Sequence, residues 1–165
     1  MINAIVCVDK NWGIGKNNDL LFSIKADMQY FRENTKEKIV VCGFNTLLSF
    51  PGSKPLKGRS TIVLCPKEIE RDDCYCIHDF DEMVRLIKEL SNTQEVFIIG
   101  GAMMYKSMLP YYDRVYVTHV DAADPEATAF FPNLVEAGFV VKSETSTQEE
   151  GDYKFKMVTY EKGEN

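Results

Sequence analysis

The stretch Val96-Phe97-Ile98-Ile99-Gly100-Gly101 decides the fold class of this 165-residue chain. Its four apolar residues, three of them β-branched, are typical of a strand that is buried on both faces. The two glycines predict a tight turn into a helix that ends near Leu109. A strand that leads through a turn into a helix is the repeating unit of a parallel sheet covered by helices.

The same alternation of strand and helix patterns continues through most of the chain. Apolar runs predict strands at residues 2–8, 38–42, 60–65 and 74–77. Helical spacing of apolar residues predicts helices at residues 23–34, 44–50 and 79–90. Beyond Pro110 only strands follow, at residues 114–120, 139–145 and 153–161. We therefore predict one domain, residues 1–165, with a three-layer α/β fold. Its mostly parallel central sheet should have about eight strands and an antiparallel C-terminal edge.

Composition and charge exclude several classes of protein. The 19 Lys and Arg residues against 25 Asp and Glu residues give a net charge of −6, which argues against nucleic-acid binding. The chain has neither a signal-peptide pattern nor a long apolar run, so we expect no membrane association. An odd number of cysteines, five, is typical of free thiols in a reducing cytoplasm. Because Cys74-Tyr75-Cys76 with His78 lacks the spacing of a zinc site, we expect no metal.

Asp27 is an unusual residue for its position. On the helix that carries Ile24, Met28 and Phe31, it lies at the edge of the apolar stripe, about 40° from Phe31. One interpretation is a carboxylate that reaches solvent or supports the first helical turn. The other is a partly buried carboxylate with a raised pKa, which holds the amino and ring N–H groups of a ligand.

Two glycine turns suggest a ligand that carries phosphate. Gly100-Gly101 and the Gly43-Phe44-Asn45-Thr46 stretch each follow a strand and begin a helix, where backbone N–H groups attract anions. Each could instead be only a tight turn. Residues 12–18, Trp-Gly-Ile-Gly-Lys-Asn-Asn, lack the third glycine of a dinucleotide fingerprint. With only two histidines and no nucleophile motif, the chain is expected to leave its chemistry to a cofactor.

Taken together, these motifs resemble the dihydrofolate reductase family in order and spacing over nearly the whole chain. The matching positions are Met1-Ile2, Ile5 to Asp9, Ile14-Gly15, Leu20, Ala26-Asp27-Met28, Phe31, Gly43, Thr46, Ser49, Leu56, Gly58-Arg59, Ile99-Gly100-Gly101, Tyr105, Tyr116 to Asp121 and Phe131-Pro132. The resemblance implies hydride transfer from NADPH to 7,8-dihydrofolate, which yields tetrahydrofolate for one-carbon metabolism and thymidylate synthesis. It also favours the second interpretation of Asp27.

The resemblance assigns residues to catalysis and to substrate binding. The catalytic residues would be Asp27, Thr118, Leu20 and Tyr105. Asp27 would bind the pterin 2-amino and N3 groups with Thr118 in support, and Arg59 would hold the α-carboxylate of the glutamate tail. The substrate-binding residues would be Ile5, Val6, Asp27, Met28, Phe31, Ser49, Phe50, Leu56, Arg59, Ile99 and Thr118.

The resemblance also places the cofactor, beneath a closing loop at residues 9–23. The cofactor-binding residues would be Cys7, Ile14, Gly15, Gly43, Phe44, Asn45, Thr46, Leu64, Cys65, Pro66, Lys67, Ile99, Gly100, Gly101, Ala102, Met103, Met104 and Tyr105. Where the family often has basic or hydroxyl residues for the 2′-phosphate, this chain has Phe44, Cys65-Pro66 and Met103. NADPH is the expected cofactor, NADH remains an alternative, and Lys67 or Lys16 could replace the missing donors.

Other departures concern the two loops over the site. Leu21-Phe22 stands where the family usually has Pro-Trp, which predicts weaker binding of diaminopyrimidine antifolates. Residues 121–128 lack the usual Gly-Asp-Thr that braces the closing loop. The leading hypothesis is a cytoplasmic, monomeric enzyme that antifolates inhibit. The alternatives are a pteridine or pyrimidine reductase, such as the reductase domain of riboflavin synthesis, which would not need Arg59, and a folate- or nucleotide-binding protein without turnover.

Overall fold

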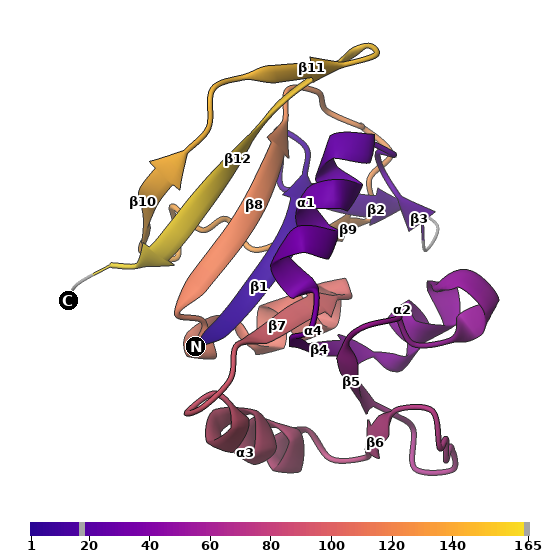
Figure 1. Cartoon of the computed structure of the whole chain (residues 1–165). Coiled ribbons are helices and arrows are strands. Elements are labelled where there is room, and N and C mark those ends of the chain that lie inside the picture. Colours follow the sequence, from indigo (N-terminus) through magenta and orange to yellow (C-terminus); the bar gives the residue numbers. More distant parts are fainter. Residues whose placement is uncertain (17–18, 164–165) are drawn as a thin grey trace.

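A mixed sheet forms the centre of the computed structural model, which describes residues 1–16 and 19–163. The order of its strands is β10-β12-β8-β1-β7-β4-β5-β6, with β11 paired to β12, and Figure 1 shows the C-terminal strands at one end and β5 and β6 at the other. These strands are β1 (Ile2–Val8), β4 (Ile39–Gly43), β5 (Ser60–Leu64), β6 (Tyr75–Ile77), β7 (Val96–Gly100), β8 (Arg114–Val120), β10 (Phe139–Glu144), β11 (Gln148–Glu150) and β12 (Tyr153–Lys162).

The direction of the strands confirms the predicted fold class. β1 runs parallel to β7 and β8, β7 is parallel to β4, and β4, β5 and β6 continue the parallel order. β12 is antiparallel to β8 and to β10, which makes the C-terminal edge antiparallel. Strands followed by crossover helices align in parallel, whereas the turn at residues 151–152 reverses the chain, so that β12 runs back along β11 and then along β10.

Helices cover both faces of the sheet because its side chains alternate between them. The helical elements are α1 (Lys25–Thr35), α2 (Phe44–Ser49), η1 (Pro51–Ser53), α3 (Phe80–Leu90), α4 (Ala102–Ser107) and η2 (Leu109–Tyr111). On one face, Ala4 and Val6 of β1 pack with residues of α3 and α4. On the other face, Ile5 of β1 packs with residues of α1 and α2. The predicted site residues of α1 therefore lie on the second face.

The stretch between β1 and α1 is more ordered than its sequence predicts. The expected loop at residues 9–23 contains β2 (Gly13–Lys16) and β3 (Asp19–Leu20), and β2 also pairs with β9 (Ala129–Phe130). Positions 17 and 18 of that loop, which end the Trp-Gly-Ile-Gly-Lys-Asn-Asn stretch, lie outside the described residues. These strands were missed because β2 contains two glycines and its partner β9 is remote in sequence. The short β11 was missed as well.

Candidate active site

The carboxylate of Asp27 lies in the first turn of α1 and faces β8 and β1. Thr118 of β8 donates its hydroxyl to Asp27 Oδ1 at 2.7 Å. Cys7 of β1 is the register partner of Thr118 and also hydrogen-bonds to Asp27. Three predicted site residues from three elements therefore meet at one carboxylate.

Burial is the largest influence on the pKa of this carboxylate. Loss of solvent raises the pKa of Asp27 above its ordinary value, although hydrogen bonds from Thr118 and Cys7 act in the opposite direction. Burial is also the largest cause that raises the pKa of the Cys7 thiol, and the charge of Asp27 adds to it. Cys7 therefore remains a protonated donor, and Asp27 is the acceptor at the centre of the group.

Tyr105 of α4 is buried and contacts the strand that carries Ile5. Its hydroxyl donates a 2.9 Å hydrogen bond to the carbonyl of Ile5, and its ring packs edge-on against Phe131, with 4.9 Å between the ring centroids. The Tyr105 carbonyl accepts a 2.9 Å hydrogen bond from Tyr112. A carbonyl has two lone pairs, so Ile5 keeps one for a ligand N–H group. The cluster fixes the edge of β1 beside Asp27.

Most of the predicted apolar wall comes together on this face. Phe31 of α1, Phe50 and Leu56 pack against a buried cluster that includes Ile5 and Ile99. The other predicted residues are placed differently. Of the predicted substrate residues, Val6 packs in the core cluster of the opposite face, Met28 is 53% exposed, and Ser49 donates to the Thr46 carbonyl. Leu20, a predicted catalytic residue, is 79% exposed.

Arg59 lies at the open end of this wall. Its Nε donates to Thr35 Oγ1 at 3.1 Å, its Nη1 donates to the Lys57 carbonyl at 2.6 Å, and its guanidinium lies 5.8 Å from the centre of the Phe31 ring. Burial and the charge of Arg32 lower the pKa of Arg59. In the part of the chain that the structure describes, the observed ion pairs of the arginines involve Arg71 and Arg114 and leave Arg59 without a carboxylate.

The two glycine turns meet at the carboxyl edge of the sheet. Gly100 pairs with Cys42 at the end of β4, and Thr46 of α2 lies against both glycines of the Gly100-Gly101 turn. A Cβ atom on Gly101 would lie 3.3 Å from Thr46 Oγ1, closer than ordinary contact. The predicted residues Gly43, Phe44 and Asn45 begin α2, and Ala102 begins α4, whereas Met103 is 84% exposed and Met104 packs into the opposite core.

The end of β5 continues this edge. Leu64 pairs with Gly43, and Cys65 donates its amide to the Ile77 carbonyl at 2.8 Å. The segment Cys65-Pro66-Lys67 then leaves the sheet. The His78 ring contacts the Pro66 carbonyl at 3.0 Å through Nδ1. The predicted cofactor residues of β4, β5 and β7 thus lie along one edge.

Asp9 is the principal site-supporting residue that sequence reasoning missed. It is 1% exposed and accepts hydrogen bonds from the amides of Asn11 at 2.8 Å, Gly13 at 2.7 Å and Asp124 at 3.0 Å. A Cβ atom on Gly13 would lie 2.9 Å from the Asp9 carboxylate, which explains the glycine. A buried carboxylate just after a strand is the signal that could have found it.

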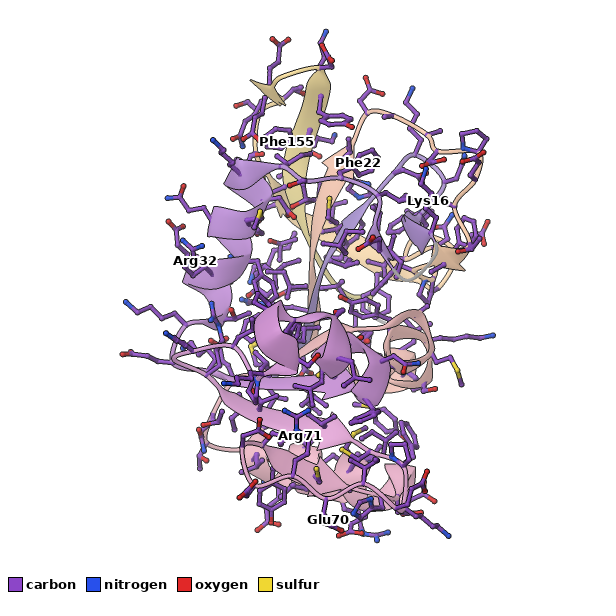
Figure 2. The ribbon with its side chains drawn as sticks, turned by 90° about the vertical axis from the view of Figure 1, so that its right-hand side faces the viewer. Lys16, Phe22, Arg32, Glu70, Arg71 and Phe155 are labelled. Atoms are coloured by element: carbon purple, nitrogen blue, oxygen red, sulfur yellow. The ribbon has the colours of Figure 1, made fainter. Side chains whose placement is uncertain are left out.

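Lys16 completes the brace between the two loops. Its ammonium lies 3.1 Å from Asp124 and 3.6 Å from Glu126, and the Gly15 carbonyl accepts from the Thr128 amide at 2.9 Å. Ile14 of the same strand is buried in the core. These contacts stand in place of the missing Gly-Asp-Thr. Figure 2 shows that Lys16 lies far from Arg71, which is at the β5–β6 end of the sheet.

We expect Asp9→Ala to lower the free energy of unfolding by about 2–4 kcal/mol, because one buried and two partly buried amides lose their acceptor. Denaturant unfolding followed by circular dichroism measures this loss. Asp121→Ala is the matched control, since Asp121 contacts Lys10 in an exposed ion pair of 3.0 Å and should change stability by less than about 1 kcal/mol. Equal losses in the two variants would contradict the bracing role of Asp9.

Within residues 1–16 and 19–163, no group of three or more His, Cys, Asp or Glu side chains is arranged to hold a metal ion. No helix in these ranges has the length and apolar character that a membrane crossing requires.

Comparisons with known proteins show the family of the chain and agree with its fold. The family model described as dihydrofolate reductase matches residues 1–162. A dihydrofolate reductase of Bacillus subtilis (strain 168) is 32% identical over 165 residues, which cover 98% of this chain and 95% of the relative. One of Bos taurus is 34% identical over 98% of this chain and 97% of its own. A solved dihydrofolate reductase from Enterococcus faecalis, complexed with NADP(H) and RAB-propyl, has a TM-score of 0.85 at 24% identity and covers 99% of this chain and 97% of its own.

The fold and the site define an α/β oxidoreductase with a carboxylate at the substrate end and glycine turns at the cofactor end. The chain belongs to the dihydrofolate reductase family. This confirms the predicted family, fold class and type of reaction, the NADPH-dependent reduction of dihydrofolate to tetrahydrofolate.

Proposed function

We propose that this chain acts as a single-domain, monomeric dihydrofolate reductase in the cytoplasm, with Asp27 as its central catalytic residue. The observation that carries the proposal is the partly buried Asp27 carboxylate, which accepts a 2.7 Å hydrogen bond from Thr118 beside the carbonyl of Ile5. A dihydropterin presents an amino group and a ring N–H on one edge, which match one carboxylate and one free carbonyl lone pair. Antifolates that present the same donors would compete for this place.

The cofactor edge fits a nicotinamide dinucleotide. The glycines at 100 and 101 leave backbone open beside Thr46, in a space that a Cβ atom would fill. Open backbone amides at two helix starts suit a pyrophosphate. When NADPH is bound, it supplies the hydride that reduces the pterin. We assign Gly43, Thr46 and the Gly100-Gly101 turn to hold it.

The residues of the chain orient the substrate and exclude water from it. Asp27 holds the pterin edge and its negative charge favours a protonated ring, while the wall around Phe31 and Phe50 removes water from the ring faces. Tyr105 and Thr118 act as positioning residues, since each donates its hydroxyl to a neighbouring protein oxygen. Solvent delivers the proton to N5. Arg59 holds the carboxylate of the glutamate tail.

A spectrophotometric assay tests the proposed function. Purified protein mixed with dihydrofolate and NADPH should oxidise the nucleotide with formation of tetrahydrofolate, and the same assay with NADH measures cofactor preference. Turnover of a tail-free pteridine or a pyrimidine without any turnover of dihydrofolate would favour the alternative reductases. Tight binding of both ligands without oxidation of either nucleotide would indicate a binding protein.

Lys67 is the remaining candidate for the 2′-phosphate, because Lys16 is paired with Asp124 and Glu126. We expect Lys67→Gln to lower kcat/KM with NADPH by about tenfold, the value of one charge-assisted contact, and to leave kcat/KM with NADH within about twofold. Steady-state kinetics with both nucleotides measure this. Lys106→Gln, an exposed change on α4, is the control. An equal loss of kcat/KM with the two nucleotides would show that Lys67 does not bind the 2′-phosphate.

A further inference from the structure

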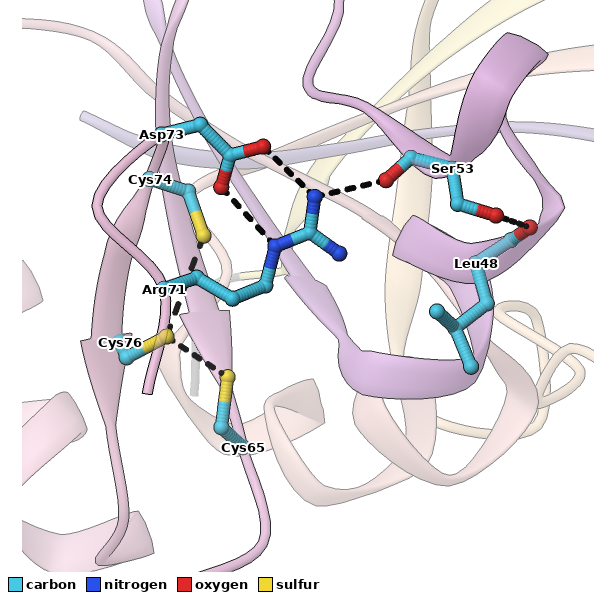
Figure 3. Close-up of polar contacts among 7 residues, drawn as sticks. All are labelled: Leu48, Ser53, Cys65, Arg71, Asp73, Cys74 and Cys76. Carbon is cyan, nitrogen blue, oxygen red and sulfur yellow. Dashed lines mark hydrogen bonds and ion pairs between the residues drawn. The ribbon is translucent and has the colours of Figure 1, made fainter. Parts of the chain in front are cut away.

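Four of the five cysteines lie close together at the β5–β6 end of the sheet, on the face that carries α1 and α2. They are Cys42 of β4, Cys65 after β5, Cys74 before β6 and Cys76 of β6. Cys65 donates its thiol to Cys76 Sγ at 3.1 Å, and Cys74 Sγ lies 3.9 Å from Cys76 Sγ. Figure 3 shows Cys76 between the other two thiols. The group around Asp27 contains none of these three thiols, and Cys65 alone belongs to the predicted cofactor edge.

The geometry favours one pair. A disulfide has an S–S length of about 2.05 Å, so the two sulfurs of Cys65 and Cys76 need to approach by only about 1 Å. The backbone already holds them in place, because Val63 and Cys76 are register partners and the Cys65 amide bonds to the Ile77 carbonyl at 2.8 Å. We propose that Cys65 and Cys76 are a thiol modification site that forms a reversible disulfide on reaction with a low-molecular-weight disulfide such as oxidised glutathione.

An ion pair of Arg71 and Asp73 lies beside the thiols. The guanidinium of Arg71 makes two hydrogen bonds to the Asp73 carboxylate, at 2.9 and 2.6 Å, and a third of 2.7 Å to the Ser53 carbonyl, and Figure 3 shows the Arg71 side chain beside Cys74. Burial is the largest cause that raises the pKa of the Cys74 thiol, the Asp73 carboxylate adds to it, and the Arg71 guanidinium acts in the opposite direction. The reactive form of a cysteine is its thiolate, so exposure to solvent and to the oxidant decides which thiol of the group reacts first.

The difference in burial indicates which of the two thiols reacts first. Cys65 is 4% exposed and burial raises its pKa to about 12, whereas Cys76 is only partly buried. The Cys76 thiolate therefore attacks one sulfur of oxidised glutathione and breaks its S–S bond. One glutathione leaves as a thiolate and takes up the proton that Cys76 lost. The Cys65 thiolate then attacks Cys76 Sγ and displaces the second glutathione, which takes up the proton of Cys65. The two cysteines lose two electrons, and oxidised glutathione is reduced to two thiols.

The disulfide would act on the cofactor edge, an effect that rests on the proposed function. Cys65 directly precedes Pro66-Lys67, and His78 holds the Pro66 carbonyl at 3.0 Å. A covalent bond that pulls Cys65 toward β6 shifts the start of this segment. We expect oxidation to raise the KM for NADPH at least about threefold and to leave the KM for dihydrofolate within about twofold.

Thiol mapping tests the modification site without any use of activity. The protein is equilibrated with reduced and oxidised glutathione at several ratios, its free thiols are alkylated, and its tryptic peptides are analysed by mass spectrometry. The expected product links the peptide that carries Cys65 to the peptide that carries Cys74 and Cys76, and reduced glutathione reverses it. Five alkylated cysteines at every ratio, or glutathione adducts without the link, would overturn the proposal.

Two matched variants identify the partner of Cys65. Cys74→Ser should keep the link and Cys76→Ser should abolish it, and thermal unfolding under reducing conditions checks that both are folded. A link that survives in Cys76→Ser assigns the bond to Cys74 and overturns the proposed pair; if that variant does not fold, fragmentation of the wild-type linked peptide decides between the two. A mapped disulfide with an unchanged KM for NADPH would disprove the effect on the cofactor edge. A mapped disulfide in a protein that does not reduce dihydrofolate would count against the proposed function alone.

Discussion

Asp27→Asn is expected to lower kcat for dihydrofolate reduction at neutral pH by about 10²-fold or more, in a protein that remains folded. The amide has the shape of the carboxylate, and its oxygen still accepts the hydroxyl of Thr118, which lies 2.7 Å from Asp27 Oδ1. What is lost is the negative charge that favours a protonated pterin. Part of the rate should return in acid, because solvent then supplies the proton more readily. Steady-state kinetics across pH measure both effects.

Glu33→Gln is the matched control, since it removes the same charge from an exposed position of the same helix. Glu33 accepts a 3.0 Å hydrogen bond from Gln29 and does not contact Asp27. Its kcat should stay within about twofold of the wild type at every pH. Unchanged turnover in Asp27→Asn would remove Asp27 from the mechanism.

The pKa of Asp27 also has a consequence for stability. Burial raises it above the ordinary value of 3.8, so the folded protein binds this proton more tightly than the unfolded chain does. The stability that this preference contributes is fully present below pH 3.8 and is lost as the pH rises through the folded-state pKa. The ionised carboxylate therefore costs stability at neutral pH, and Asp27→Asn removes that cost. We expect its Tm relative to the wild type to increase from acidic to neutral pH.

The sequence could predict this part of the site because its signals are local. Asp27 lies at the edge of an apolar stripe, and a helix of 11 residues fixes its direction once the apolar face is known. The glycines of the Gly100-Gly101 turn follow an apolar strand that any α/β sheet would bury. Helix periodicity therefore placed Asp27 at the edge of the apolar stripe, and the strand pattern placed the glycine turn at the carboxyl end of its strand. The family resemblance then decided between the two interpretations of Asp27.

The brace of the closing loop could not be predicted, because its contacts join residues that are remote in sequence. Asp9 accepts the amide of Asp124, and Lys16 reaches Asp124 and Glu126. No periodic pattern links these positions. The sequence shows only that the family's usual Gly-Asp-Thr is missing, whereas three-dimensional packing shows which contacts replace it. The pairing of Cys65 with Cys76 was missed for a similar reason, since it depends on the register of β5 and β6.

Arg59→Gln is expected to raise the KM for dihydrofolate by about 10²-fold with little change in kcat, because a bidentate guanidinium–carboxylate contact contributes about 2–3 kcal/mol. Hydrogen bonds to Thr35 and to the Lys57 carbonyl orient Arg59, and the ring of Phe31 lies 5.8 Å from its guanidinium. Arg59→Lys should lose most of the same affinity, since an ammonium cannot reproduce the planar pair of donors. Steady-state kinetics with varied dihydrofolate measure the change.

A substrate without the glutamate tail tests whether the loss of affinity in Arg59→Gln comes from the contact with the carboxylate. A dihydropterin without the glutamate tail has no carboxylate for Arg59, so wild type and Arg59→Gln should reduce it with the same kcat/KM within about twofold. Arg32→Gln is the control for charge alone, because Arg32 lies near enough to affect the pKa of Arg59, and Figure 2 shows its side chain on the outer side of α1. A wild type that does not prefer dihydrofolate over the tail-free pterin would place the chain with the pteridine reductases. We expect a strong preference for dihydrofolate over the tail-free pterin, which Arg59→Gln abolishes and Arg32→Gln preserves. This result would show that the enzyme recognises its substrate through the glutamate carboxylate.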